Sequence, residues 1–162
     1  MDVTPPLSRF DRGYRDGDPP WVIEGPQPAV ARLAADGAFT GAVLDAGCGV
    51  GEHTIHLTRL GHDVLGADGS RAAVARARGG ATAAGVDARF TVADMLDPAG
   101  LGPFDTVLDS ALFHLFDAGD QARYARALAG LVRPGGSVHL LAPAVTGGPE
   151  FGPVIDPGLH TP

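Results

Sequence analysis

The chain of 162 residues contains no lysine, and its 12 basic residues are all arginines. Without lysine it cannot form a P-loop nucleotide site, a Schiff base or a pyridoxal-phosphate anchor. A single cysteine, Cys48, excludes an internal disulfide and fits a reducing compartment. No apolar run approaches the roughly 18 residues of a membrane-spanning helix, and no N-terminal signal pattern is present. We therefore expect a cytoplasmic protein without a membrane partner.

Clustered positive charge is also missing. The formal net charge is −7 at pH 7, and the arginines are scattered along the chain. Nucleic-acid binding requires basic clusters that contact phosphates, so we do not expect nucleic acid as a partner. The length suits one domain that can bury a real core.

The most informative stretch covers residues 42–70. An apolar dipeptide leads into the turn DAGCGVG at Asp45–Gly51, and apolar residues at helical spacing follow. Gly61 predicts the end of that helix, and residues 63–67 predict a second strand that ends at Asp68. This is half of a mononucleotide-binding βαβ unit, in which glycines let backbone N–H groups approach a ligand. The acid at the tip of the second strand is placed to bond ribose hydroxyls.

The ligand is constrained by the residues around the turn. The dinucleotide fingerprint GxGxxG requires a glycine where this chain has Glu52, and Asp45 precedes the glycines. Carboxylates that flank the loop repel a pyrophosphate and attract a ligand with an ammonium and a sulfonium. A nicotinamide-dependent reductase remains the alternative, which a comparison of ligand binding decides.

DAGCGVG resembles the first motif, (D/E)xGxGxG, of the class I S-adenosylmethionine-dependent methyltransferases. Further matches follow in order, namely VADMLD at 92–97, FDTVLDS at 104–110 and LVRPGG at 131–136, and the resemblance covers about residues 20–143. It implies an α/β fold with a Rossmann-like, doubly wound, mostly parallel sheet of about five strands and helices on both faces. FDTVLDSALFHLF, with PPW and GPQP upstream, is similar to the small-molecule branch of thiopurine and heterocycle methyltransferases.

The resemblance implies S-adenosyl-L-methionine as cofactor and methyl transfer to S, N or O of a small aromatic or heterocyclic acceptor. Asp68 would bind the ribose, Asp94 with Met95 the adenine, and Asp45 with the region of Ser110 the ammonium. The complete set of expected cofactor-binding residues is Tyr14, Trp21, Asp45, Gly47, Cys48, Gly49, Gly51, Asp68, Gly69, Asp94, Met95 and Ser110.

Histidines offer further candidates. His114 follows the fourth predicted strand on the substrate side, where it is either a catalytic base, since histidine titrates near neutrality, or a packing or orienting residue. His53 and His56 are spaced as HxxH, but no cysteine or acid cluster completes a coordination shell, so we expect no metal. We expect the Cys48 side chain to fill the loop.

Three segments are expected. Residues 1–28 are rich in proline, glycine and charge and will not form a long helix, yet they contain Tyr14 and Trp21. They are either a disordered arm or, as in similar methyltransferases, a lid over the cofactor. Residues 29–143 form the cofactor-binding core. Within it we predict helices over 28–38, 70–79 and 120–131, and later strands over 88–93, 104–110 and 137–142.

Residues 144–162 form a Gly/Pro-rich tail. The family carries two more strands after the fifth, but nine of the residues after Ala142 are Gly or Pro, and only 151–155 can extend briefly. The chain therefore resembles a methyltransferase that lacks its last two strands, and a noncatalytic cofactor-binding remnant is the alternative function. The strand over 137–142 then becomes an exposed apolar edge, so we expect a homodimer through that edge or the tail.

Overall fold

The structure is a computed structural model that describes residues 3–142. Its centre is a five-stranded parallel sheet in the order β3-β2-β1-β4-β5. The strands are β1 (Ala42–Ala46), β2 (Asp63–Asp68), β3 (Arg89–Val92), β4 (Phe104–Ser110) and β5 (Val132–Leu141). From β1 the chain builds β2 and β3 on one side, and it then crosses to the other side of β1 to form β4 and β5. The strand order therefore reverses between β1 and β4. In open α/β sheets, ligands bind at the carboxyl ends of the strands at such a reversal.

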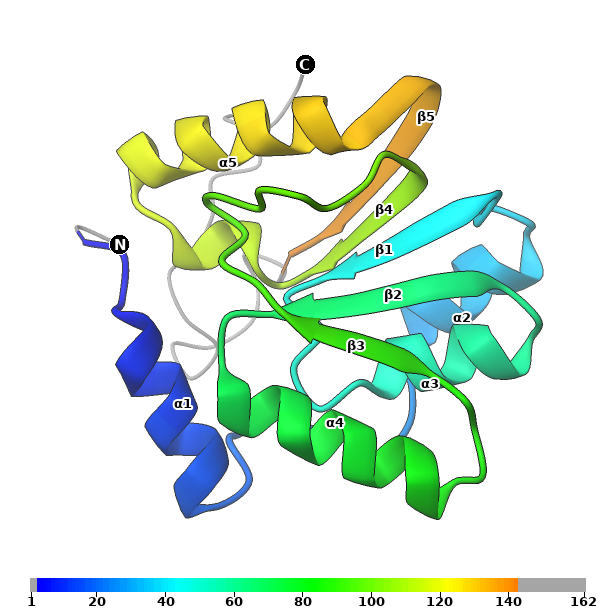
Figure 1. Cartoon of the computed structure of the whole chain (residues 1–162), viewed down its shortest axis with the longest axis horizontal. Helices are drawn as coiled ribbons and strands as arrows, with labels where there is room; N and C mark the ends of the chain where they lie inside the picture. The colour runs from blue at the N-terminus through cyan, green and yellow to red at the C-terminus, as the bar shows by residue number, and fades with distance from the viewer. Residues whose placement is uncertain (1–2, 143–162) are drawn as a thin grey trace.

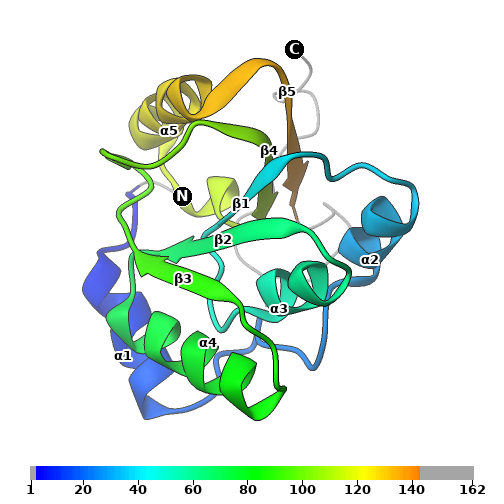
Figure 2. The same ribbon diagram turned by 45° about the vertical axis from the view of Figure 1, so that its right-hand side comes forward.

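Helices cover both faces of the sheet (Figures 1 and 2). One face is packed by α2 (Pro28–Ala35), α3 (Glu52–Arg59) and α4 (Arg71–Ala83), and the other by α5 (Ala118–Leu131). The helix α1 (Leu7–Asp16) and the 3-10 turn η1 (Phe113–Leu115) lie at the carboxyl edge of the sheet, towards which the strand arrows point. This arrangement confirms the predicted fold class.

The core follows from the alternation of side chains along the strands. Val43 of β1 packs with Val30 of α2 and Leu57 of α3, while the next residue, Leu44, packs with Leu128 of α5. Because both faces of the sheet are covered, strands of this type are apolar at nearly every position. The two layers therefore hold the ends of β1, β2 and β4 in fixed positions.

Several predicted boundaries were wrong. The predicted end of α4 at Gly79 is incorrect, because the helix continues through both glycines to Ala83 and ends before Gly85, at φ 65°. Buried Ala77 and Ala81 pack there in the cluster with Phe90, and this packing outweighs the poor helix propensity of glycine.

Other boundaries shift by a few residues. The helix α2 stops at Ala35 rather than at residue 38, since Gly37 adopts a φ of 73°. The helix α5 begins at Ala118, two residues before the prediction, because the Asp117 carboxylate caps it by accepting from the Asp120 N–H. The strand β3 is two residues shorter than predicted.

The predicted turn before the fifth strand is a bulge inside it. Val132 pairs with Phe104, but the next paired residue of β5 is Ser137, opposite Thr106. The intervening residues Arg133–Gly136 bulge out of the pairing, and Gly135 has a φ of 82°. The strand therefore begins at Val132 instead of residue 137.

The structure describes the segment before α2 from residue 3 onwards, whereas the C-terminal tail lies outside the described residues. The expectation of no long helix in residues 1–28 must be refined, because ten of them form α1. The tail at 144–162, the possible extension at 151–155 and the predicted lack of two further strands lie outside the described residues. Within the described part, β5 is an edge strand, with Val138 and Leu140 about two-fifths exposed (41% and 42%).

Candidate cofactor site

The turn between β1 and α3 depends on its glycines. Gly47, Gly49 and Gly51 have φ values of 68°, 54° and 85°, which side-chain-bearing residues rarely adopt. A Cβ on Gly51 would lie 2.7 Å from the Phe90 ring. The turn can therefore pass tightly under its neighbours and present backbone to a ligand at the N-terminus of α3.

Asp68 joins this turn to the end of β2. The Gly49 N–H donates to its Oδ2 at 2.9 Å, and the Ser70 N–H donates to its Oδ1 at 2.8 Å. Burial raises the pKa of Asp68, and these two hydrogen bonds oppose the rise. The result is a partly desolvated acceptor beside the glycine turn, at the position where the sequence predicts ribose binding.

Two residues of the turn point their side chains into the protein. The Asp45 carboxyl is 1% exposed and accepts a 2.7 Å hydrogen bond from Thr54 Oγ1, which ties β1 to α3. Burial raises the pKa of Asp45. Burial also raises the pKa of the Cys48 thiol well above its usual value, and this side chain packs in the cluster with Val74. Direct contact of Asp45 with a cofactor stays a prediction.

The remaining predicted core residues lie at the ends of β2, β3 and β4. Asp94 is exposed and accepts from the Leu96 N–H at 2.9 Å, whereas Met95 is buried in the cluster with Ala67. Half-buried Ser110 ends β4 and precedes Ala111, which has a φ of 71°. The Ala111 N–H donates to the Leu141 carbonyl at 2.8 Å, which fixes the end of β4 against β5.

Tyr14 and Trp21 bring the N-terminal segment to the turn. The Trp21 Nε1–H donates to the Tyr14 hydroxyl at 2.8 Å, and a Cβ on Gly49 would lie 3.0 Å from that hydroxyl. Tyr14 is buried and Trp21 is half exposed. Burial raises the pKa of Tyr14 to about 12, and the nearby Asp68 charge adds to the rise. Tyr14 therefore lies directly over the glycine turn, with Trp21 holding it.

His114 lies in η1, and its imidazole is buried. Within residues 3–142 its Nδ1 has no hydrogen-bond partner, and burial lowers its pKa. Burial therefore favours the neutral form of the ring. The described residues contain no group of three or more His, Cys, Asp or Glu side chains placed to hold a metal ion.

Asp109 anchors the loop that carries His114. Its buried carboxyl accepts from the Leu112 N–H at 2.8 Å and from the Phe113 N–H at 3.1 Å. Burial raises the pKa of Asp109 to about 6. The Tyr124 hydroxyl has no hydrogen bond of ordinary geometry to the described residues, but desolvation and the Asp109 charge raise the pKa of Tyr124 above its usual range.

Sequence reasoning missed two polar residues around the site. Thr54 supports Asp45, and Asp11 of α1 accepts hydrogen bonds from Ser70 and Ala72 at the start of α4. A polar residue after a glycine turn is a weak signal for Thr54. Nothing in the local pattern around Asp11 indicates its partners, which are about sixty residues away.

A family model for a methyltransferase domain matches residues 43–136, from β1 to the β5 bulge. The chain belongs to the class I S-adenosylmethionine-dependent methyltransferases. This membership decides against the nicotinamide-dependent alternative. It also makes S-adenosylmethionine the cofactor.

Relatives place the chain among methyltransferases that differ in substrate. It is 34% identical over 150 residues to the 2-heptyl-1-hydroxyquinolin-4(1H)-one methyltransferase of Mycobacteroides abscessus, covering 88% of this chain and 65% of that protein. A solved structure from work on the conversion of a disulfide bond into a thioacetal group during echinomycin biosynthesis is 46% identical, with a TM-score of 0.80. That match covers 83% of this chain and 59% of the other.

A further similar structure contains bound S-adenosylhomocysteine. The 1,6-didemethyltoxoflavin-N1-methyltransferase of Burkholderia thailandensis, with 1,6-didemethyltoxoflavin and S-adenosylhomocysteine, is 29% identical with a TM-score of 0.64. The match covers 79% of this chain and 56% of that one. In all three comparisons the chain therefore spans less than two thirds of the relative.

The residues present fit this cofactor. Asp68 offers a carboxylate acceptor for ribose hydroxyls, and Gly47 and Gly49, which carry no Cβ, let the backbone of the turn approach a ligand closely. Among residues 3–142 no helix is long and apolar enough to cross a membrane.

Proposed function

We propose that this chain transfers the methyl group of S-adenosylmethionine to a sulfur, nitrogen or oxygen atom of a small aromatic or heterocyclic acceptor. The observation that carries the proposal is the Asp68 carboxylate, held between the Gly49 and Ser70 N–H groups. When bound, the cofactor supplies a methyl group already activated on a sulfonium. The chain's task is alignment, and proximity and orientation can contribute about 7–11 kcal/mol to a reaction of this kind.

Each end of the cofactor has a proposed partner. Asp68 accepts from the ribose hydroxyls, and Asp94 with the Met95 N–H binds the adenine edge. The carbonyl at Ser110 and the field of Asp45 favour the ammonium. The positive φ of Ala111 supports this role for Ser110, since strained backbone at a strand end is typical of binding sites. Gly69 follows Asp68 directly and offers its backbone beside the ribose, while the Leu7 side chain fills the place that a Cβ would take.

The acceptor is proposed to lie beyond the end of β4, near His114. A neutral, buried imidazole suits an orienting residue, or a base for an acceptor that loses a proton. Trp21 is half exposed, and its indole could pack against a planar ring. The heterocyclic substrates in the names of two relatives support a heterocyclic acceptor, and the disulfide chemistry of the third supports sulfur among the candidate atoms.

We further propose a cytoplasmic homodimer that binds neither nucleic acid nor membrane. The net charge of −7 disfavours phosphate backbones. In the edge strand β5, the half-exposed apolar side chains of Val138 and Leu140 lie on the same face of the sheet as α5, and an apolar edge invites pairing with a second chain. A two-fold axis would close such a contact.

Turnover tests this proposal. The chain is incubated with S-adenosylmethionine and a panel of planar heterocyclic thiols, amines and hydroxyls, and release of S-adenosylhomocysteine is measured. We expect release with at least one acceptor class and loss of release in Asp68→Ala, while Asp63→Ala at the exposed start of β2 turns over as wild type. Tight cofactor binding with no turnover across the panel would favour the noncatalytic remnant instead.

A further inference from the structure

The helix α1 is tied to the N-terminus of α4 by Asp11. Ser70 Oγ donates to Asp11 Oδ1 at 2.8 Å, and the Ala72 N–H donates to the same oxygen at 2.9 Å. The first N–H groups of a helix lack partners within the helix and carry partial positive charge, so a carboxylate is stabilising there. These contacts, the Ala72 bond first, hold the pKa of Asp11 below its usual value.

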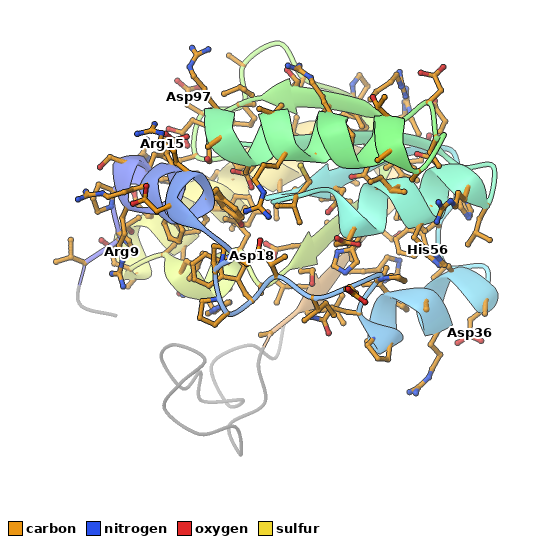
Figure 3. The ribbon with its side chains drawn as sticks, turned by 90° about the horizontal axis from the view of Figure 1, so that it is seen from below. Arg9, Arg15, Asp18, Asp36, His56 and Asp97 are labelled. Atoms are coloured by element: carbon orange, nitrogen blue, oxygen red, sulfur yellow. The ribbon has the colours of Figure 1, made fainter. Side chains whose placement is uncertain are left out.

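A second tie runs in the opposite direction, from α4 to the end of α1. The Arg76 guanidinium donates to the Gly17 carbonyl at 2.8 Å and to the Tyr14 carbonyl at 3.3 Å, and it pairs with Asp18. Cations are favoured at the C-terminal ends of helices. Figure 3 shows α1 beside α4, with Asp18 labelled just beyond the end of α1. Each helix therefore contributes a charged side chain to an end of the other.

Between these ties, α1 lies over the proposed ribose site. At one end of the span, a Cβ on Gly69 would lie 2.6 Å from Leu7 Cδ2. At the other, the Tyr14 hydroxyl lies over Gly49. Asp68 is hydrogen-bonded to Gly49 and precedes Gly69, so its carboxylate sits below the span.

We propose that Asp11 and Arg76 are positioning residues that fasten α1 as a strap over Asp68, and that release of this strap controls exchange of the nucleoside cofactor. The inference rests on the proposed function and adds its gating. When either tie is lost, the strap opens more often. Ligand then enters and leaves faster, and affinity falls because Tyr14 is less often in place over the turn.

Stopped-flow fluorescence of Trp21 with S-adenosylhomocysteine tests the strap, since Trp21 is hydrogen-bonded to Tyr14. We expect dissociation to accelerate about 3- to 10-fold in Asp11→Ala and Arg76→Ala, and less in Asp11→Asn, which keeps a neutral acceptor. Association also accelerates, by a smaller factor, so the dissociation constant rises. A purely structural defect would lower the bindable fraction without raising the association rate.

Two control variants separate the general effect of removing a charge from α1 or α4 from the specific loss of a tie between the two helices. Arg12→Ala lies next to Asp11 on α1, and Arg71→Ala lies on α4. Both side chains are exposed, and we expect wild-type rates in both variants. Thermal melting monitors the fold. If the wild-type chain binds S-adenosylhomocysteine but Asp11→Ala and Arg76→Ala exchange it at wild-type rates, the strap is overturned and the proposed function stands. If the wild-type chain itself does not bind, both fail.

Discussion

The backbone N–H of Gly49 donates a 2.9 Å hydrogen bond to the carboxylate of Asp68, 19 residues later in the chain. This bond joins the glycine turn after β1 to the end of β2. The two strongest features of the sequence are thus parts of one site. The Gly49 and Ser70 N–H groups hold the carboxylate in place, so little ordering of this side chain is required on binding.

Replacement of Gly51 by alanine should destabilise the fold. Gly51 has a φ of 85°, and an added Cβ would lie 2.7 Å from Phe90, so Gly51→Ala should lower the free energy of unfolding by about 2 kcal/mol or more. Gly79→Ala is the control, because this helical glycine has no atom within 4 Å of an added Cβ. It should gain about 0.5–1 kcal/mol in urea unfolding. Equal effects of the two changes would contradict the geometry of the turn.

Asp109 should make stability depend on pH. Burial raises its pKa in the folded state to about 6, above the value near 3.9 expected in the unfolded chain. Between these values the folded state binds more protons. The Asp109 contribution to the free energy of unfolding is therefore complete below about pH 4 and is lost as pH rises through about 6.

The variant Asp109→Asn removes this titration. The stability of the wild type minus that of the variant should fall by about 2–3 kcal/mol between pH 4 and pH 7, measured by urea unfolding at a series of pH values. Parallel pH profiles for the two proteins would show that the carboxyl is not desolvated as described.

Ala111 should be relieved of strain by glycine. Its φ of 71° costs an alanine about 1–2 kcal/mol, which a glycine would not lose. Part of this stabilisation is offset because glycine makes the unfolded chain more flexible. Ala111→Gly should therefore raise the free energy of unfolding by up to about 1 kcal/mol. Ala111→Val, β-branched at the same φ, should lower it. A stabilising valine would show that the residue is not held at positive φ.

The apolar edge of β5 should control assembly. We expect the wild-type chain to sediment as a dimer at micromolar concentration, and Leu140→Lys to sediment as a monomer, because a charge there must be desolvated on pairing. Leu60→Lys is the control, since Leu60 is 55% exposed at the end of α3, away from the edge. A monomeric wild type, or dissociation in both variants, would argue against this interface.

The sequence predicts those parts of the site that depend on local backbone chemistry. A strand, a GxGxG turn and a helix position Asp68 by short-range geometry, so its place follows from a motif of fewer than thirty residues. The parallel sheet follows equally, because its strands are apolar and alternate with helices.

Features that depend on tertiary packing were not predictable from the pattern. Asp11 meets Ser70 across 59 residues, in a segment whose proline and glycine content gave no sign of a docked helix. Gly79 and Gly80 indicated the end of α4, but the helix continues past them because its buried alanines pack against Phe90. The β5 bulge at Arg133–Gly136 was predicted as a turn, because both turns and bulges use glycine at positive φ.

Calorimetric titration with S-adenosylhomocysteine tests the central claim, that Asp68 and the glycine turn form the cofactor site. We expect a dissociation constant in the micromolar range, about −8 kcal/mol at 1 μM, and no heat with NADH. Asp68→Ala should weaken binding about 10- to 150-fold, equivalent to about 1.5–3 kcal/mol, because it removes a charged hydrogen-bond partner. Asp63→Ala, at the exposed start of the same strand, should bind as wild type. Wild-type protein that gives no heat with millimolar ligand, or an Asp68→Ala variant that binds as tightly as Asp63→Ala, would contradict the account.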